Sequence, residues 1–472
     1  MPITRRQFLK RATLATAGTV MAPSLFGNPW VRKAFADTIG DRYLVILFLD
    51  GGNDGLNTIV PIGNEGGLRA AYDLFRTSGG GGINIAPGAL SVPSLAMNDP
   101  NTGAALGFHP GLASLATMYD AGDLAVIQGC GYPDYSLSHD EARVIWQSGN
   151  PLGVGTIAST GWCGRHLAFE YAPTDIPAVT IDNVIARELR QFTTSVLAIP
   201  RLSRFGFPFD DYDEDDIPLV DAAYVDMHAQ AAGSDQELVA LLGNAGKATA
   251  DSTKSYPPLD SLYTTDRAAW NSAYSGLSSS TARDLREVAK IIYGVHTGQP
   301  GVAARFFQVD NGGYDTHADQ GAGETNGRHY SLLAEIGDAI KLFFDDMNDM
   351  GIGNKVTMVV WSEFSRRIPQ NSNGTDHGSQ GPMFVIGEPV TGGIYGNHPN
   401  INEAALDNSE NTVYSQDAGN GFRSTDFRDV FGTILKHWTN MSDANIQSFV
   451  LPLDTGPAAD YWTVKNFDMG FL

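Results

Sequence analysis

Three stretches of the sequence place carboxylate and imidazole side chains close together beside apolar runs. Asp50 ends the run YLVILFLD, the segment DNGGYDTHADQ holds Asp315 and His317, and NGTDHGSQG holds Asp376 and His377. Carboxylate oxygens and imidazole nitrogens are common ligands of divalent metal ions. An acid–base pair would also use an Asp beside a His, but it would not account for the other carboxylates. The pattern therefore favours one or two divalent ions.

His398 is a sixth candidate ligand, because it follows the apolar run PMFVIG in the segment GGIYGNHP. In open α/β sheets, ligands bind beyond the carboxyl ends of the strands. We therefore expect all six side chains to lie together at that edge of a sheet. Such ligands accept zinc, manganese or magnesium, so the residue types leave the identity of the metal open.

Two further residues could act on a substrate at such a centre. Ser138 precedes the helical pattern HDEARVIWQSG, and the positive end of a helix stabilises a nucleophile or a bound anion. The alternative is that Ser138 only caps this helix, because Glu141 follows it at capping-box spacing. Arg366, in the segment SEFSRR, could hold an anion by a bidentate contact, or it could pair with Glu363.

These segments need strands and helices to bring them together. Nearly continuous apolar runs of strand length predict strands that are buried on both faces, as in a parallel sheet, at 43–50, 124–129, 305–310, 356–364 and 382–387. Helical patterns occur at 111–122, 138–149, 281–295, 329–351 and 424–438. The alternation predicts one α/β sandwich with a mostly parallel central sheet and helices on both faces. The pattern at residues 202–280 predicts a helical insertion or a cap over the sheet.

The N-terminus has the pattern of an export signal. Arg5 and Arg6, a modest apolar segment and the ending Ala34-Phe35-Ala36 predict a twin-arginine signal peptide over residues 1–36. The alternative is an ordinary amphipathic helix. Residues 37–472 would then form a single periplasmic or secreted domain. No transmembrane segment is predicted, because a membrane-spanning helix needs roughly 20 apolar residues.

The composition is strongly acidic, with 31 Lys and Arg against 53 Asp and Glu and a net charge of −22. Such a surface repels nucleic acid and anionic membranes and can concentrate divalent cations. The acidic run at 210–216 lacks the glycine and the final glutamate of a calcium-binding loop, which favours a solvated loop. Cys130 and Cys163 could form a disulfide in an oxidising compartment, or could remain buried thiols.

The sequence resembles the exported bacterial family called domain of unknown function 1501. The resemblance rests on FLDGGNDGLNTIVP, GYPDYSLSHDEARVIWQSG, NGGYDTH, SEFSRR and GTDHGSQGPMFVIG, and it covers nearly all of the chain after residue 36. That family is related to the alkaline phosphatase and sulfatase superfamily. The resemblance therefore implies an alkaline-phosphatase-like sandwich with one or two metal ions at the strand ends.

The resemblance also implies roles for single residues. Asp50 corresponds to the first-strand metal aspartate, and Asp376 and His377 correspond to the Asp-His pair on the same metal. Asp315 resembles a ligand of the second metal, and His398 resembles the late histidine of that second site.

Ser138 falls in the region of the superfamily's nucleophile, but two other motifs depart from the superfamily pattern. The superfamily usually has Asp-x-x-x-His at its second metal site, whereas Asp315 and His317 here are separated by one residue. The second site is therefore expected to differ or to be missing. Cys130-Gly-Tyr-Pro133 continues with Asp134 and lacks the arginine of Cys-x-Pro-x-Arg, which argues against formylglycine sulfatase chemistry.

The sequence thus predicts an exported metal-dependent hydrolase of phosphate or sulfate esters. Ser138 or a metal-bound water would attack a small anionic ester. The alternative is a non-catalytic binding or assembly module of the cell envelope on the same fold, with an envelope polysaccharide as its partner. Nucleic acid is a partner in neither case.

Overall fold

A computed structural model of the chain describes residues 40–132, 135–150, 159–172, 174–206, 217–321, 326–399, 401, 424–451 and 466–472. The predicted signal peptide over residues 1–36 and the acidic run at 210–216 lie outside these residues. Within the described part of the chain, no helix has both the length and the apolar character that crossing a membrane requires.

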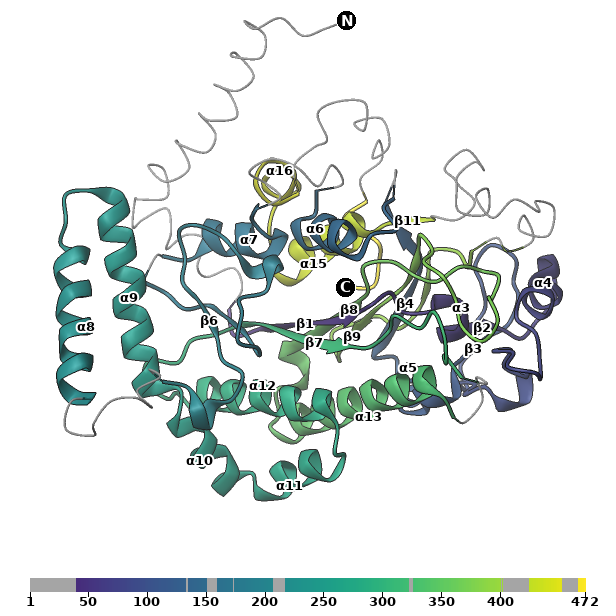
Figure 1. Ribbon diagram of the computed structural model, residues 1–472, viewed down its shortest axis with the longest axis horizontal. Coiled ribbons are helices and arrows are strands. Elements are labelled where there is room, and N and C mark those ends of the chain that lie inside the picture. Colours follow the sequence, from purple (N-terminus) through teal and green to yellow (C-terminus); the bar gives the residue numbers. More distant parts are fainter. Residues whose placement is uncertain are drawn as a thin grey trace, which may run out of the picture.

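A large, mostly parallel sheet forms the centre of the molecule (Figure 1). Its described strands are β1 (Tyr43–Asp50), β4 (Leu124–Gly131), β5 (Ala178–Thr180), β6 (Val196–Ala198), β7 (Phe306–Gly312), β8 (Val356–Trp361), β9 (Gly381–Ile386), β10 (Gly393–Tyr395) and β11 (Thr425–Asp426). Their order is β10-β4-β9-β8-β1-β7-β5-β6, and β11 also pairs with β4. The predicted α/β class with a mostly parallel sheet is confirmed.

Strand β9 is the exception, because it runs antiparallel to both of its neighbours, β4 and β8. The start of β9, rather than its end, therefore lies at the edge where β1, β7 and β8 end. The segment that connects β8 to β9 leaves this edge and returns to it. A second, two-stranded sheet pairs β2 (Ile59–Pro61) with β3 (Leu106–Phe108).

Helices cover both faces of the central sheet (Figure 1). One face carries α5 (Ala113–Ala121), α12 (Ser280–His296) and α13 (Arg328–Asp349), and the other carries α6 (His139–Ser148), α7 (Trp162–Glu170) and α15 (Phe427–Trp438). Alternate residues of β1 enter the two cores, with Val45 and Leu47 on the α12–α13 side and Leu44 and Ile46 on the other side. This double burial explains why the sequence of β1 is apolar throughout. The shorter helices α3 (Gly55–Thr58), α4 (Leu68–Phe75) and α16 (Asp443–Asn445) lie outside these layers.

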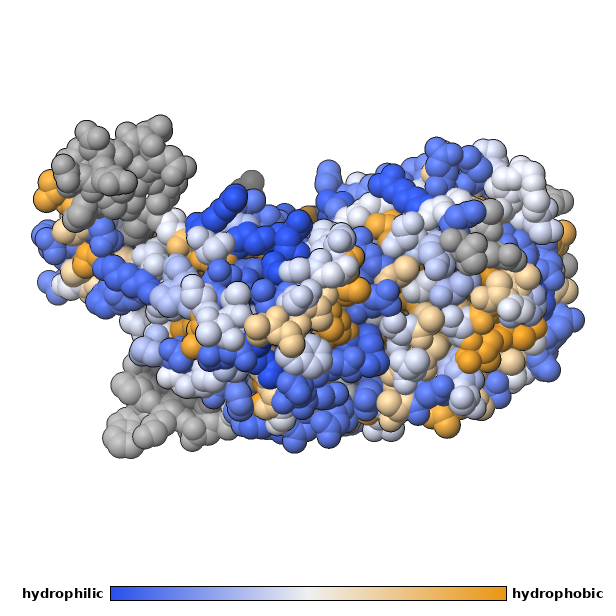
Figure 2. Space-filling model, turned by 90° about the horizontal axis from the view of Figure 1, so that it is seen from below, coloured by the Kyte–Doolittle hydropathy of each residue, from blue (hydrophilic) through white to orange (hydrophobic). Residues whose placement is uncertain are grey.

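The segment 202–280 contains the helices α8 (Ile217–Ala232), α9 (Glu237–Ser255), α10 (Pro258–Asp266) and α11 (Ala268–Gly276). Helices α10 and α11 pack against α12, whereas α8 and α9 form a hairpin at the left end of Figure 1. Glycine allows this hairpin to pack closely, since a Cβ atom on Gly243 would lie 2.1 Å from the backbone nitrogen of Ala232. Viewed from below, the surface is mostly hydrophilic, with apolar residues gathered in a few patches, most clearly toward the right (Figure 2).

A buried ion pair fixes the loop that follows β1. Both guanidinium amino groups of Arg76 donate to the carboxylate of Asp54, over 2.7 and 3.0 Å, and both side chains are fully buried. Gln320 donates a third hydrogen bond to Asp54 over 2.6 Å. Arg76 also donates to the carbonyl oxygens of Arg367 and Ile368, each over 2.7 Å. The pair therefore ties the loop after β1 to the segment between β8 and β9.

The two cysteines are buried free thiols, so the disulfide alternative does not hold in this structure. Cys130 lies near the end of β4 and Cys163 lies in α7. Burial raises the pKa of both thiols well above the ordinary value, which keeps them protonated and unreactive near neutral pH.

Glu188 is a buried carboxyl group in the short helix Arg187–Leu189. Neither of its carboxyl oxygens has a hydrogen-bond partner within the described part of the chain. Burial, together with the negative charge of Asp310, raises the pKa of Glu188 to about 8. The neutral form of Glu188 therefore stabilises the fold at acidic pH, and this stabilisation is lost as pH rises from the unfolded value towards 8.

We expect the Glu188→Gln variant to be more stable than the wild type at about pH 9, by up to a few kcal/mol, and to show no such gain near pH 5. The reason is that glutamine stays neutral while the wild-type carboxyl must ionise inside the protein. Thermal unfolding at the two pH values measures this difference. Glu237→Gln, at an exposed position of α9, is the matched control and should leave the pH dependence unchanged. An equal gain at both pH values would contradict the prediction.

Candidate metal centre

A connected group of ionisable side chains lies at the carboxyl edge of the sheet, beside the ends of β1, β7 and β8. It is assembled from the end of β1, the start of α6, the segment after β7 and the segment between β8 and β9. We call this group the edge cluster, and its members are Asp50, His139, Arg143, Asp315, His317, Glu363, Arg366, Asp376 and His377.

Each histidine of the edge cluster makes a hydrogen bond through Nδ1 to an oxygen that can only accept. The three contacts join His139 to Glu363 over 2.8 Å, His317 to Asp376 over 3.0 Å and His377 to the backbone oxygen of Leu137 over 2.6 Å. Because an ionised carboxylate or a carbonyl has no proton to donate, each Nδ1 carries the hydrogen. In the neutral ring, Nε2 is then left with a free lone pair.

These Nε2 atoms converge on Asp315. The Nε2 atoms of His317 and His377 lie 2.9 Å apart, and they lie 3.2 and 3.3 Å from Oδ1 of Asp315. Nε2 of His139 lies 3.6 Å from Oδ2 of Asp315 and has no hydrogen-bond partner among the described residues. Ligand atoms of His139, Asp315 and His377 all lie within 4.8 Å of one another.

This donor set fits a divalent metal ion. Two neutral Nε2 lone pairs at 2.9 Å repel each other unless a proton or a cation lies between them. Burial lowers the pKa of His377, which disfavours the proton at that ring. Imidazole nitrogens of His139 and His377 and a carboxylate oxygen of Asp315 lie within 4.8 Å of one another, which is the kind of N/O ligand set that zinc takes. Nε2 of His139, which has no hydrogen-bond partner among the described residues, is an atom that such an ion would bind.

Glu363 lies behind His139 and orients its ring. The carboxylate is fully buried and accepts hydrogen bonds from the amides of Gly51 over 3.0 Å and Gly52 over 3.1 Å. Its hydrogen bond with His139 raises the pKa of that imidazole. Only glycine fits at position 51, where φ is +119° and a Cβ atom would lie 2.4 Å from the backbone nitrogen of Asp315. A carboxylate that positions a metal-binding histidine in this way is a common feature of metal sites.

Arg366 holds Asp315 in place instead of facing a substrate. Its fully buried guanidinium donates to Oδ1 of Asp315 over 2.7 Å and to the backbone oxygens of Gly52, Tyr314 and Thr375. Burial alone would raise the pKa of Asp315, but the hydrogen bond and charge of Arg366 outweigh it and lower this pKa to about 2. The predicted anion-binding role of Arg366 is thus replaced by a structural one. The predicted alternative, a pair with Glu363, is also replaced, because Arg366 pairs with Asp315.

Asp50 and Asp376, both expected as ligands, occupy supporting positions. Asp50 accepts a hydrogen bond from Nη2 of Arg143. Burial raises the pKa of Asp50, while the charge of Arg143 opposes this effect. Asp376 lies behind His317 and accepts its Nδ1 hydrogen, so it orients the ring of His317. Asp315, His317 and His377 are brought together as the sequence predicts.

His398 lies apart from the edge cluster, contrary to the expectation. It is buried, its backbone amide donates to Asp99 over 2.8 Å, and its Nδ1 lies 3.0 Å from the backbone oxygen of Pro399. The cause is the topology of the sheet. His398 follows β10, and β4, β9 and β8 separate β10 from β1.

Ser138 occupies the N-cap position of α6, but its side chain makes no capping hydrogen bond. Glu141 instead contacts the hydroxyl of Ser136 over 2.8 Å. The capping alternative therefore does not account for the hydroxyl of Ser138. This side chain is exposed and adjoins His139 in the sequence. The nucleophile hypothesis for Ser138 stays a prediction.

From the sequence alone, His139, Arg143 and Glu363 are not predicted as ligands or catalytic groups. The signal for the first two was their spacing of four residues, which places both on one face of α6 at its N-terminal end. Glu363 follows β8 at the same edge as the other candidates, and it was considered only as a partner for Arg366.

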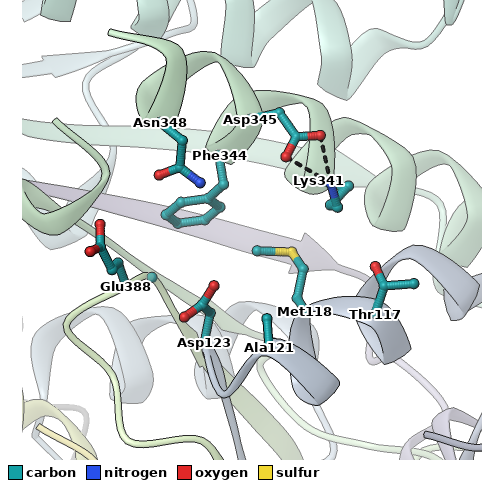
Figure 3. A pocket seen from close by; sticks show the side chains of 10 residues that line it. Thr117, Met118, Ala121, Asp123, Lys341, Phe344, Asp345, Asn348 and Glu388 are labelled. Carbon is teal, nitrogen blue, oxygen red and sulfur yellow. Dashed lines mark hydrogen bonds and ion pairs between the residues drawn. The ribbon is translucent and has the colours of Figure 1, made fainter. Parts of the chain in front are cut away.

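A separate cavity of about 210 Å³ lies at the opposite edge of the sheet (Figure 3). Asp123, which precedes β4, and Glu388, which follows β9, line one side of it. Lys341 and Asp345 of α13 form an ion pair of 2.6 Å on the other side. The residues that line this cavity include no member of the edge cluster.

The fold and the edge cluster define a mixed α/β protein with a histidine–carboxylate centre at the carboxyl edge of a mostly parallel sheet. The chain belongs to the family described as "Protein of unknown function (DUF1501)", which matches residues 91–417, well over half of its length. The family resemblance predicted from the sequence is therefore confirmed. No curated protein matches the chain.

Proposed function

We propose that this chain is an exported metal-dependent hydrolase of phosphate or sulfate esters, on an alkaline-phosphatase-like fold. The observation that carries the proposal is the convergence of three Nε2 atoms on Asp315, with each Nδ1 already bonded to a protein acceptor. Imidazole rings that are oriented in advance by hydrogen bonds at Nδ1 are the arrangement that a metal centre needs.

His139, Asp315 and His377 would hold the ion, because their ligand atoms lie within 4.8 Å of one another. His317 is a further candidate ligand, because its Nε2 lies 2.9 Å from that of His377. A ligand set rich in imidazole favours zinc over magnesium, which prefers oxygen ligands. When bound, the ion would polarise an ester oxygen and lower the pKa of an attacking hydroxyl or water. Side chains of Asp315 and His317 are 48% and 46% exposed, so a substrate can reach the centre from solvent.

The other members of the edge cluster would keep these ligands in position. Glu363 and Asp376 fix the orientation of two imidazole rings, and Arg366 fixes the carboxylate of Asp315. The exposed hydroxyl of Ser138, next to His139 at the N-terminus of α6, is the protein group available as a nucleophile. A water molecule is the other candidate nucleophile.

The proposal is tested on the full chain after export in a bacterial host. Metal content is measured by mass spectrometry, and activity is measured against aryl phosphates, phosphate diesters and aryl sulfates. The proposal requires bound metal and turnover of at least one ester class that a chelator abolishes and added metal restores. Protein that binds no divalent ion would rule out the proposed function.

We expect the Asp376→Ala variant to bind the metal about 10- to 100-fold more weakly than the wild type, which is the usual effect of losing a carboxylate behind a histidine ligand. The reason is that His317 would lose the acceptor that fixes its tautomer. Competition with a metal-binding dye measures the affinity. Asp73→Ala, an exposed aspartate in α4, is the control. Unchanged affinity in Asp376→Ala would show that the orientation of His317 does not depend on Asp376.

A further inference from the structure

Arg143 of α6 lies between two carboxylates of the edge cluster. Its Nη2 is bonded to Asp50, and its Nε lies 3.8 Å from Oε1 of Glu363. The guanidinium also lies 5.9 Å from the centre of the Phe48 ring. The side chain is 33% exposed, and Nη1 has no partner among the described residues. Arg143 is thus a fixed cation that still has donors available to a ligand from solvent.

The charges of the edge cluster determine how many ions it can hold. Its four carboxylates and two guanidiniums leave a net charge of −2 when the three imidazoles are neutral, as metal ligands must be. The four carboxylates are those of Asp50, Asp315, Glu363 and Asp376. One divalent ion cancels this charge. A second ion would have to displace Arg143 from Asp50 and Glu363.

We propose that the edge cluster holds one divalent ion and that the loaded centre selects esters with a single negative charge. This inference rests on the proposed function. Sulfate monoesters and phosphate diesters share this chemistry, because each presents one charged tetrahedral group. Nη1 of Arg143 would bind a non-bridging oxygen of that group. A phosphate monoester dianion would bring a second negative charge towards Asp50 and Asp315 without a further cation to balance it.

Hydrolysis of such an ester consumes one water molecule. The oxygen of Ser138 or of water forms a bond to sulfur or phosphorus, and the bond from that atom to the ester oxygen breaks. The leaving oxygen takes up the proton that the nucleophile releases. The net products are an alcohol and either sulfate or a phosphate monoester, after water has cleaved any serine ester that forms.

The test compares esters with the same nitrophenyl leaving group at about pH 8, where a phosphate monoester is a dianion because its second pKa is about 6. Nitrophenyl sulfate and methyl nitrophenyl phosphate represent the two monoanion classes, and nitrophenyl phosphate represents the dianion. Calorimetry with methyl sulfate, dimethyl phosphate and inorganic phosphate measures binding without turnover. We expect the loaded wild type to bind at least one monoanion about tenfold or more tightly than inorganic phosphate.

Two variants test the charge argument directly. Asp50→Asn removes one negative charge next to Arg143, and it should shift the preference towards inorganic phosphate by about tenfold. Arg143→Gln should weaken monoanion binding by a similar factor and allow more than one ion per chain to bind at saturating metal. Asp251→Asn removes the same charge from α9, at the other end of the molecule in Figure 1, and should change neither property.

The outcomes separate this inference from the proposed function. Two ions per wild-type chain, or tighter binding of inorganic phosphate than of both monoanions, would overturn the inference even if esters are hydrolysed. One ion per chain with monoanion binding but no hydrolysis of any ester would support the charge selection and remove the hydrolase proposal. A preference that Asp50→Asn and Asp251→Asn shift equally would also overturn the inference.

Discussion

The His377→Ala variant should lose metal affinity by more than 100-fold and lose any ester hydrolysis with it. Its Nε2 lies 2.9 Å from Nε2 of His317 and 3.3 Å from Oδ1 of Asp315, and His377 is one of the three residues whose ligand atoms lie within 4.8 Å of one another. Loss of a direct ligand should exceed the 10- to 100-fold effect that is typical when a residue behind a ligand is removed. Metal content after dialysis and turnover of the preferred ester measure the result.

A loss of folding must be separated from a loss of ligand in this experiment. His437→Ala is the matched control, because His437 in α15 is partly exposed and pairs with Asp468 away from the edge cluster. Thermal unfolding without metal should give similar midpoints for both variants and the wild type. Retention of stoichiometric metal by His377→Ala would refute the ligand set given above.

The Asp54→Ala variant should destabilise the protein by about 3–5 kcal/mol, the usual cost of breaking a buried ion pair from one side. Arg76 would keep its positive charge in a fully buried site without its carboxylate partner. Denaturant unfolding of the metal-free protein measures the change in free energy. Because the pair ties together two segments of the edge cluster, metal affinity should also fall in this variant.

An exposed ion pair provides the control for this prediction. Asp251→Ala removes one partner of the ion pair between Lys247 and Asp251, whose side chains are both more than half exposed. Its effect should stay within about 1 kcal/mol, because water replaces most of the interaction. Equal effects of the two substitutions would contradict the proposed structural role of the buried pair.

The strands of the sheet could be predicted from the sequence because strands that are buried on both faces have nearly continuous apolar sequences. The run at 43–50 coincides with β1, and the runs at 124–129 and 356–364 begin where β4 and β8 begin. The direction of a strand cannot be predicted in this way, since a buried parallel strand and a buried antiparallel strand have the same apolar pattern. The sequence therefore did not reveal that β9 is reversed.

The edge cluster was predictable in part. Asp315, His317 and His377 were found because loops at one edge of a sheet converge, and that argument needs only the strand pattern. Which carboxylates bind and which only support depends on single contacts. Asp50 is bonded to Arg143, a residue from a different element, and no spacing within the sequence indicates that contact.

The roles of Arg366 and Arg143 also could not be predicted from the sequence. Arg366 lies in the segment SEFSRR and was expected to bind the substrate anion, but it donates to backbone oxygens and to Asp315. Arg143 lies in a helix whose polar residues read as an ordinary exposed face. Only the folded structure distinguishes the buried guanidinium from the accessible one.

The reversal of β9 lets the stretch at 362–380 leave the sheet and return to it without a crossover helix. Parallel neighbours need a crossover, usually a helix, to carry the chain back along the sheet, which limits what can change without moving that helix. This stretch has no such constraint, because it departs from β8 and rejoins β9 at the same rim. Insertions at its exposed residues 371 and 372 could alter which molecules the protein accepts while the sheet and the edge cluster stay intact, so diversification among relatives should concentrate there.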